Sequence, residues 1–221
     1  MNIAILCSDE NHPVMPYLQS WIAKQNVEHS VSLCFRKADL SAADVLFLVS
    51  CQELIGPDVR QLFRSVLVLH ASALPAGRGW SPHIWQILAG SNQLTVTLLE
   101  ANDPVDSGAI WATKDFALQG HELYDEINAT LFQAELELMD WAVSNFHQVV
   151  PRDQLSEGAS YWARRRPEDS QLDPQRSIAD QFDQLRVADP ERYPAFFDLR
   201  GCRYRVRLEK EKEKEKENKD E

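Results

Sequence analysis

The sequence predicts an α/β fold: a doubly wound, mostly parallel sheet of Rossmann-like type, extended by a small C-terminal helix and β-hairpin. Three patterns indicate this fold. Short apolar runs alternate with stretches of helical spacing up to about residue 146. The stretch 122–146 repeats its apolar residues with the period of a long helix. Residues 202–208 alternate apolar and basic side chains, as a strand with one buried face does.

Six apolar runs of strand length predict the sheet. They lie at residues 2–7, 29–34, 44–50, 65–70, 94–100 and 109–116. Helical spacing occurs at residues 16–25, 58–63, 82–89 and 122–146, where Ser81-Pro82 suits a helix start and Gly90 a helix end. In the longest helix we expect one apolar stripe to lie on the sheet, formed by Leu123, Ile127, Leu131, Ala134, Leu138 and Trp141.

The last third of the chain differs in composition. Residues 150–173 are polar and loop-like, residues 177–187 predict a short helix, and residues 195–208 predict a hairpin around Arg200-Gly201. Residues 209–221 contain no apolar side chain and are expected to form a disordered charged tail. We therefore expect a catalytic core at 1–150, an extension at 151–208 and the tail at 209–221. One face of the hairpin must be covered by another part of this chain or by a second copy in a homodimer. This face consists of Cys202, Tyr204, Val206 and Leu208.

Composition narrows the class of partner. The chain has 221 residues and a formal net charge of −11, which argues against a nucleic acid as the main partner. It has only 8 glycines and contains no glycine-rich phosphate-binding motif. Its four cysteines are scattered without a CxxC pair, so we expect reduced thiols and no metal. With no signal-peptide pattern and no apolar run long enough to span a membrane, the expected location is the cytoplasm.

Two residues have the placement of a catalytic pair. His70 ends a predicted buried strand, and Asp106 follows the next one. Ligand sites of open α/β sheets lie outside the carboxyl ends of the strands, so the two loops can meet. A carboxylate orients an imidazole and raises its basicity, which suits proton transfer at neutral pH. Taken alone, His70 would be a partly buried structural histidine and Asp106 a turn residue; it is the ordered combination that favours a site.

The combination resembles the folate-dependent formyltransferase family over about residues 1–146. The family pattern consists of Asn-x-His-x-Ser-Leu-Leu-Pro, Arg/Lys-Gly, a Trp/Ile/Leu-rich helix, Gly-Val-Thr and Asp-[Thr/Ser/Gly]-Gly. The segments that match it here are, in order, His70-Ala71-Ser72-Ala73-Leu74-Pro75, Arg78-Gly79, Pro82-His83-Ile84-Trp85, Thr95-Val96-Thr97 and Asp106-Ser107-Gly108. Upstream, residues 50–55 resemble the loop that borders the pterin pocket. Residues 161–170 and 192–197 resemble segments that follow the core in nucleotide-sugar N-formyltransferases.

The resemblance implies transfer of a formyl group from N10-formyltetrahydrofolate to the primary amine of a nucleotide-linked amino sugar or related glycan precursor. It implies no metal. His70 would take the amine's proton or protonate the departing folate nitrogen, and Asp106 would hold His70. The remaining implied residues are Ser72 in the catalytic pocket; Ser50, Leu54, Ile55, Glu100 and Val105 at the folate; and Arg78, Gly79, Trp80, Arg164 and Arg165 at the acceptor.

One departure from the family pattern bears on activity. The family's Asn, two residues before the catalytic histidine, is Val68 here. That Asn stabilises the tetrahedral oxyanion, and losing one such donor typically costs about 10²–10³ in rate. Ser72, protonated His70 or a backbone amide are candidate replacements. Two alternatives stay open: a non-catalytic folate- or nucleotide-binding homologue, and a formyltetrahydrofolate hydrolase that uses water as the acceptor.

Overall fold

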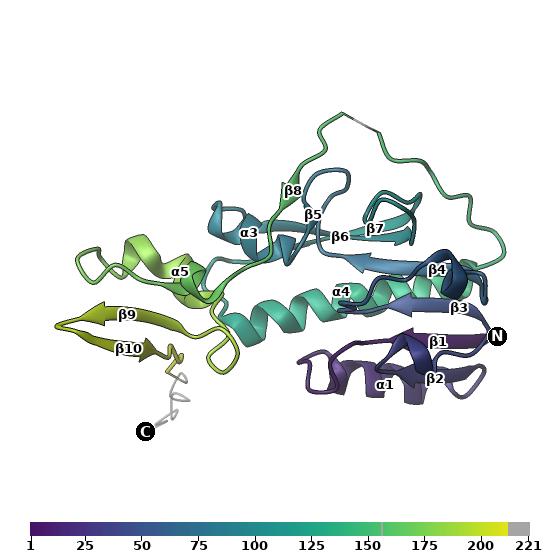
Figure 1. Ribbon diagram of the computed structural model, residues 1–221, viewed down its shortest axis with the longest axis horizontal. Coiled ribbons are helices and arrows are strands. Elements are labelled where there is room, and N and C mark those ends of the chain that lie inside the picture. The colour runs from purple at the N-terminus through teal and green to yellow at the C-terminus, as the bar shows by residue number, and fades with distance from the viewer. Residues whose placement is uncertain (156, 212–221) are drawn as a thin grey trace, which may run out of the picture. The chain divides into compact units, whose positions relative to one another are not determined.

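The computed structural model describes residues 1–155 and 157–211 (Figure 1). The chain forms two compact units, Met1–Arg165 and a second one that starts at Arg166. The first therefore extends beyond the expected boundary at residue 150, because the short strand β8 (Tyr161–Trp162) pairs with β5 (Arg78–Gly79). Most of the expected charged tail, residues 212–221, lies outside the described residues.

The first unit is built on a six-stranded sheet of order β2-β1-β3-β4-β6-β7. The pairs among β2, β1, β3 and β4 are parallel, whereas β6 and β7 are antiparallel additions. The expectation of a mostly parallel sheet is confirmed, and all six predicted strands are present. Their bounds are β1 (Asn2–Leu6), β2 (Ser30–Cys34), β3 (Ala43–Leu48), β4 (Phe63–His70), β6 (Gln93–Glu100) and β7 (Ile110–Ala117).

Helices connect these strands at the expected places. The bounds are α1 (Met15–Gln25), the 3-10 turn η1 (Lys37–Asp39), α2 (Pro57–Arg60), α3 (Pro82–Leu88) and α4 (Tyr124–Asn145). The prediction of a helix over 58–63 is wrong in length, because Phe63 already begins β4. Ser81 precedes α3 with a left-handed backbone, and no side-chain capping bond forms there. None of the described helices is long and apolar enough to cross a membrane.

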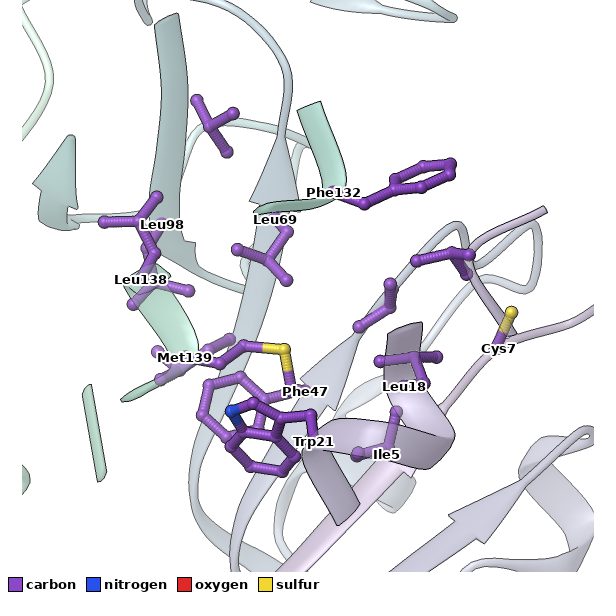
Figure 2. Packing of buried hydrophobic residues seen from close by; sticks show 14 of the residues in the cluster. Ile5, Cys7, Leu18, Trp21, Phe47, Leu69, Leu98, Phe132, Leu138 and Met139 are labelled. Atoms are coloured by element: carbon purple, nitrogen blue, oxygen red, sulfur yellow. The ribbon is translucent and has the colours of Figure 1, made fainter. Parts of the chain in front are cut away.

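The main core lies between one face of the sheet and helices α1 and α4. Figure 2 shows Trp21 of α1 and Met139 of α4 beside Phe47 of β3. Each fully buried side chain of this size contributes about 1.5–3 kcal/mol relative to exposure. The end of the predicted stripe is wrong: Trp141 is 38% exposed, and Ala142 takes the inward position.

The opposite face of the sheet carries the candidate site. Successive side chains of a strand point to opposite faces. Leu67 and Leu69 of β4 belong to the main core, so Val68 and His70 face the other way. Val68 packs there against Leu74, Leu99 and Ile110, which form a small apolar cluster. This face is therefore apolar at Val68 and turns polar at the last residue of β4.

The second unit has a small core of its own. It contains the 3-10 turns η2 (Pro167–Ser170) and η3 (Ala179–Gln181), helix α5 (Phe182–Arg186), and strands β9 (Ala195–Leu199) and β10 (Cys202–Val206). The helix expected over 177–187 is thus a 3-10 turn followed by a short α-helix. The predicted hairpin is confirmed, and Arg200 and Gly201 both have the left-handed φ values of a tight hairpin turn. On the face expected to be covered, only Val206 is partly buried, while Cys202, Tyr204 and Leu208 are exposed.

Candidate active site

The two residues proposed as a catalytic pair lie side by side. Nδ1 of His70 stands 3.6 Å from Oδ1 of Asp106, and both side chains are buried. Nε2 of His70 lies 2.9 Å from the carbonyl oxygen of Gly77 and donates to it, because a carbonyl can only accept. Oδ2 of Asp106 accepts from the backbone N–H of Gly79 at 3.0 Å. The backbone thus holds one polar atom of each side chain, and Nδ1 and Oδ1 face each other.

Asp106 reaches His70 by a route that the sequence did not indicate. Both were expected at carboxyl ends of neighbouring parallel strands, but β6 is antiparallel to β4, and its carboxyl end lies beside the middle of β4. The loop 101–109 turns back and presents Asp106 with a left-handed φ of 61°. Gly108 permits this turn, since a Cβ atom there would lie 1.9 Å from the carbonyl oxygen of Glu100. The contact therefore depends on loop conformation.

The segment Gly77–Gly79 touches both members of the pair through its backbone. On its other side this segment is held by β8 and by Ser160, the residue before β8. The hydroxyl of Ser160 accepts from the N–H of Gly77 at 2.8 Å. Gly79 has a φ of 100°, and a Cβ atom there would lie 2.3 Å from the carbonyl oxygen of Trp162. Only glycine fits this position. Gly79, expected at the acceptor, thus contacts Asp106 through its N–H group.

Ser72 lies beside Gly77, the residue that binds His70, and has an available hydroxyl. Its side chain is buried, and its Oγ has no hydrogen-bond partner among the described residues. The buried Thr97 lies opposite His70 in the sheet register and donates to the carbonyl oxygen of Ser72 at 2.6 Å. Thr97 thus fixes the turn after β4 through the backbone and leaves the Ser72 hydroxyl unengaged.

Cationic and aromatic side chains lie on and near the segment Gly77–Gly79. The guanidinium of Arg164 stands 4.7 Å from the centroid of the Trp80 ring, in cation–π geometry, and donates to Oε1 of Gln52 at 3.2 Å. Arg78 donates to Oε1 of Gln154 at 2.8 Å. The structure therefore connects the Ser50–Ile55 loop, through Gln52, with the residues expected at the acceptor.

His83 of α3 has a lowered pKa. Burial, together with the charges of Arg165, His70 and His12, lowers the pKa of His83 to about 4. His83 is therefore neutral at neutral pH. Its Nδ1 atom has no hydrogen-bond partner in the part of the chain that the structure describes.

The residues expected at the folate divide into two groups. Leu54 and Val105 are 73% and 58% exposed, on the two loops expected to border the folate. Ser50 starts the first loop with a left-handed φ of 49°. Ile55, by contrast, is buried in the core on the Val68 face of the sheet. Glu100 is not brought to the site, since it pairs with Leu67, whose face is covered by α4, and accepts from the indole N–H of Trp111 at 3.1 Å.

Sequence reasoning missed Gln154, and it matched Thr97 to the family pattern without giving it a role. The amide nitrogen of Gln154 donates to the carbonyl oxygens of Asp106 and Gly108, at 2.9 and 2.8 Å. No local pattern distinguishes one glutamine in a polar loop. Thr97 could have been found, because it is a hydroxyl residue inside the apolar strand 94–100. Across residues 1–155 and 157–211, no group of three or more His, Cys, Asp or Glu side chains is arranged to hold a metal ion.

A buried His–Asp pair near an unengaged hydroxyl, at the last residue of an inner strand of a mostly parallel sheet, is an arrangement suited to group transfer with proton transfer. The family model described as Formyl transferase matches residues 2–143. The chain belongs to this family.

Individual relatives carry different acceptor names. A methionyl-tRNA formyltransferase of Synechococcus sp. (strain JA-3-3Ab) is 29% identical over 168 residues, which are 75% of this chain and 51% of the relative. The chain thus spans about half the length of that relative. Among solved structures, a methionyl-tRNA formyltransferase from Clostridium thermocellum matches with a TM-score of 0.79 and 22% identity, covering 92% of this chain and 90% of that one.

Two further structures share the fold. HypX from Aquifex aeolicus, in complex with tetrahydrofolic acid, has a TM-score of 0.77 and 21% identity, covering 91% of this chain and 36% of HypX. A sugar N-formyltransferase from Shewanella sp. FDAARGOS_354 has a TM-score of 0.70 and 15% identity, covering 96% of this chain and 98% of that one. At these identities the likeness concerns the fold.

Proposed function

We propose that this protein transfers a formyl group from N10-formyltetrahydrofolate to a primary amine of a small molecule. The observation that carries the proposal is the buried pair of His70 and Asp106, whose Nδ1 and Oδ1 atoms stand 3.6 Å apart. Membership of the formyl transferase family supports the same reaction class.

The pair has the arrangement that deprotonation of an amine requires. Because Nε2 of His70 donates to a carbonyl, the neutral ring presents a lone pair at Nδ1. Nδ1 and the carboxylate oxygen of Asp106 are then two acceptors facing each other, and an amine N–H can be shared between them. As the amine nitrogen attacks the formyl carbon, Nδ1 takes its proton, and Asp106 stabilises the resulting imidazolium. The same proton is returned to the folate nitrogen when the carbon–nitrogen bond to it breaks.

The hydroxyl of Ser72 is the replacement we propose for the family's Asn. A tetrahedral intermediate places negative charge on the former formyl oxygen, which needs a donor. Val68 packs among apolar side chains and provides none. Ser72 is 1% exposed, and its hydroxyl makes no hydrogen bond within the described residues, so it can donate without giving up a partner.

Leu54 and Val105 suit the aromatic part of a folate. Both are exposed apolar side chains, on the loops that the family resemblance assigns to the folate. A planar ring between such side chains would remove apolar area from water, which stabilises binding by about 25 cal/mol per Å². Ser50 would shape this loop through its left-handed backbone. We leave Ile55 and Glu100 out of the folate site, since one is in the core and the other is engaged on the opposite face.

For the acceptor we propose a nucleotide-linked amino sugar. Arg78 and Arg164 place positive charge beside the pair in a chain of net charge −11, which suits a phosphorylated small molecule. We assign Trp80 and Arg165 to the same proposed acceptor site. A tRNA acceptor is disfavoured by the net charge, and a cytoplasmic location follows from the substrates proposed.

The experiment is a turnover assay with N10-formyltetrahydrofolate and a panel of nucleotide-linked amino sugars. The formamide product is followed by mass spectrometry and the release of tetrahydrofolate by absorbance. We expect formamide with at least one sugar, abolished in His70→Asn and retained in His121→Asn, which changes an exposed histidine before α4. Formyl transfer to methionyl-tRNA alone would contradict a small-molecule acceptor. Tetrahydrofolate release without formamide would show a hydrolase, and binding of folate without turnover a non-catalytic homologue.

We also propose a homodimer that covers the exposed hairpin side chains Cys202, Tyr204 and Leu208. Light scattering at micromolar concentration is expected to show twice the 25.3 kDa mass of the chain. A single species of the monomer mass, unchanged on Tyr204→Lys, would remove this part of the proposal.

A further inference from the structure

We infer that Gln154, from the loop after α4, is a positioning residue that holds Asp106 in its catalytic orientation. The inference rests on the proposed function for its catalytic part. Gln154 contributes both of its amide hydrogens to one loop: Nε2 lies 2.9 Å from the carbonyl oxygen of Asp106 and 2.8 Å from that of Gly108. A half-buried side chain with both donors on the residues around one carboxylate fixes the backbone from which that carboxylate projects.

The Asp106 loop needs such support because its backbone conformation is unfavourable by itself. A left-handed conformation is less favourable than a right-handed one for a residue with a Cβ atom, and Asp106 has a φ of 61°. Gly108 is pressed against the backbone of Glu100 at a position where no other residue fits. The two hydrogen bonds that Gln154 donates to this loop act against that cost.

The acceptor end of Gln154 reaches the other half of the site. Its Oε1 accepts from Arg78 at 2.8 Å, and Arg78 lies between the residue that binds His70 and the residue that binds Asp106. Gln154 therefore connects the loop that carries the aspartate with the segment that contacts both catalytic side chains. Its three contacts use both hydrogens and the oxygen of one planar amide group, a set of donors and acceptor that only asparagine shares, on a shorter side chain.

Two substitutions separate the parts of this role. Gln154→Met keeps the length of the side chain and removes all three contacts. Gln154→Glu keeps an acceptor for Arg78 but loses both donors to the Asp106 loop. The matched control is Gln148→Met, because Gln148 is exposed just after α4 and its side chain makes no hydrogen bond within the described residues.

The first readout is steady-state formyl transfer. Misplacing a catalytic group by about 1 Å costs up to about 10² in rate, so we expect both Gln154 variants to lower kcat between 10- and 100-fold. KM for folate is expected to change less than threefold, and Gln148→Met to behave as wild type. Gln154→Glu with wild-type kcat would overturn the inference, since that variant lacks the donors on which it depends.

The second readout needs no turnover. The N–H of Gly79 is bonded to the Asp106 carboxylate, while the N–H of Trp80 is bonded to the carbonyl of Trp162. If Gln154 holds Asp106, Gln154→Met speeds hydrogen exchange of the Gly79 amide at least tenfold and leaves the Trp80 amide unchanged. Equal acceleration of exchange at both amides would indicate general loosening of the structure. Unchanged exchange at both amides would indicate that the Gln154 contact is redundant. Either outcome overturns the inference. Because this measurement is independent of activity, failure of the proposed function would not be confused with failure of Gln154.

Discussion

Replacing Glu135 by glutamine is expected to change the pH dependence of stability. Glu135 lies on the sheet-facing side of α4, is 6% exposed, and its Oε2 has no hydrogen-bond partner among the described residues. Burial raises the pKa of this carboxyl from 4.5 to about 8. The folded protein therefore keeps the proton at neutral pH, whereas the unfolded chain has released it.

The sign and size of the effect follow from this difference. Between pH 4.5 and 8 the folded state binds one proton more than the unfolded state at this residue, so the free energy of unfolding falls by about 1.4 kcal/mol per pH unit. Over the interval of about 3.5 pH units from 4.5 to 8 the loss is about 5 kcal/mol, which is large beside the 5–15 kcal/mol of a typical domain. The contribution is fully present below pH 4.5 and is lost by pH 8.

Glutamine does not titrate, so the difference between Glu135→Gln and wild type isolates this contribution. We expect the difference in unfolding free energy to grow by about 1.4 kcal/mol per pH unit between pH 5 and 8 and then to level off. The constant cost of burying an amide cancels from this slope. The contribution of His83 cancels as well, because both proteins contain this residue. Its pKa is lowered mainly by burial, so the stabilisation it provides is lost as pH falls from 6.5 to 4, the opposite direction to Glu135.

The assay is urea unfolding at pH 5, 6, 7, 8 and 9, with Glu137→Gln as the matched control. Glu137 lies two residues further along α4, is exposed, and its pKa is lowered by hydrogen bonds from Lys114 and Gln133. Its stabilisation is lost only as pH falls below its usual range, so its difference should stay flat above pH 5. A flat difference for Glu135→Gln as well would refute the reasoning.

Three further predictions concern the site. His70→Asn and Asp106→Asn should each lower kcat severely. Because the two residues act as one unit, kcat of the double variant should fall far less than the product of the two single effects, which is checked by measuring kcat of all three variants. Ser72→Ala should lower kcat by up to about 10²–10³, whereas Val68→Asn should give no gain; a gain from Val68→Asn would show that no donor has replaced the family's Asn. Leu54→Asp should weaken binding of a folate analogue at least tenfold in fluorescence titration, and unchanged affinity would show that the folate lies elsewhere.

The sequence was sufficient where a single local pattern decides the structure. Apolar runs predicted every strand of the main sheet, and Arg200-Gly201 predicted the hairpin turn, because both depend on neighbouring residues. The role of Gln154 could not be predicted, since its contacts lie 46 and 48 positions away in the chain. The placement of Asp106 also depends on a loop that reverses direction after an antiparallel strand.

Other features were present in the sequence but were overlooked, as for Glu135, or misinterpreted, as for Trp141. Glu135 stands four residues after Leu131 and three before Leu138, so helical spacing already placed a carboxyl group on the buried stripe. Trp141 was assigned to that stripe by its hydrophobicity, although Ala142 fits the inward position better at the end of the sheet.

The pairing of β8 with β5 limits where this chain can be joined to segments of its relatives. A fragment ending at residue 150 would retain His70 and Asp106 but would lose Gln154, Ser160 and the strand beside Gly79. Exchanging C-terminal regions between relatives to change the acceptor should therefore be done after residue 165, where the first compact unit ends. An exchange made earlier would transplant part of the catalytic support together with the acceptor region, and lost activity would then be mistaken for a change in specificity.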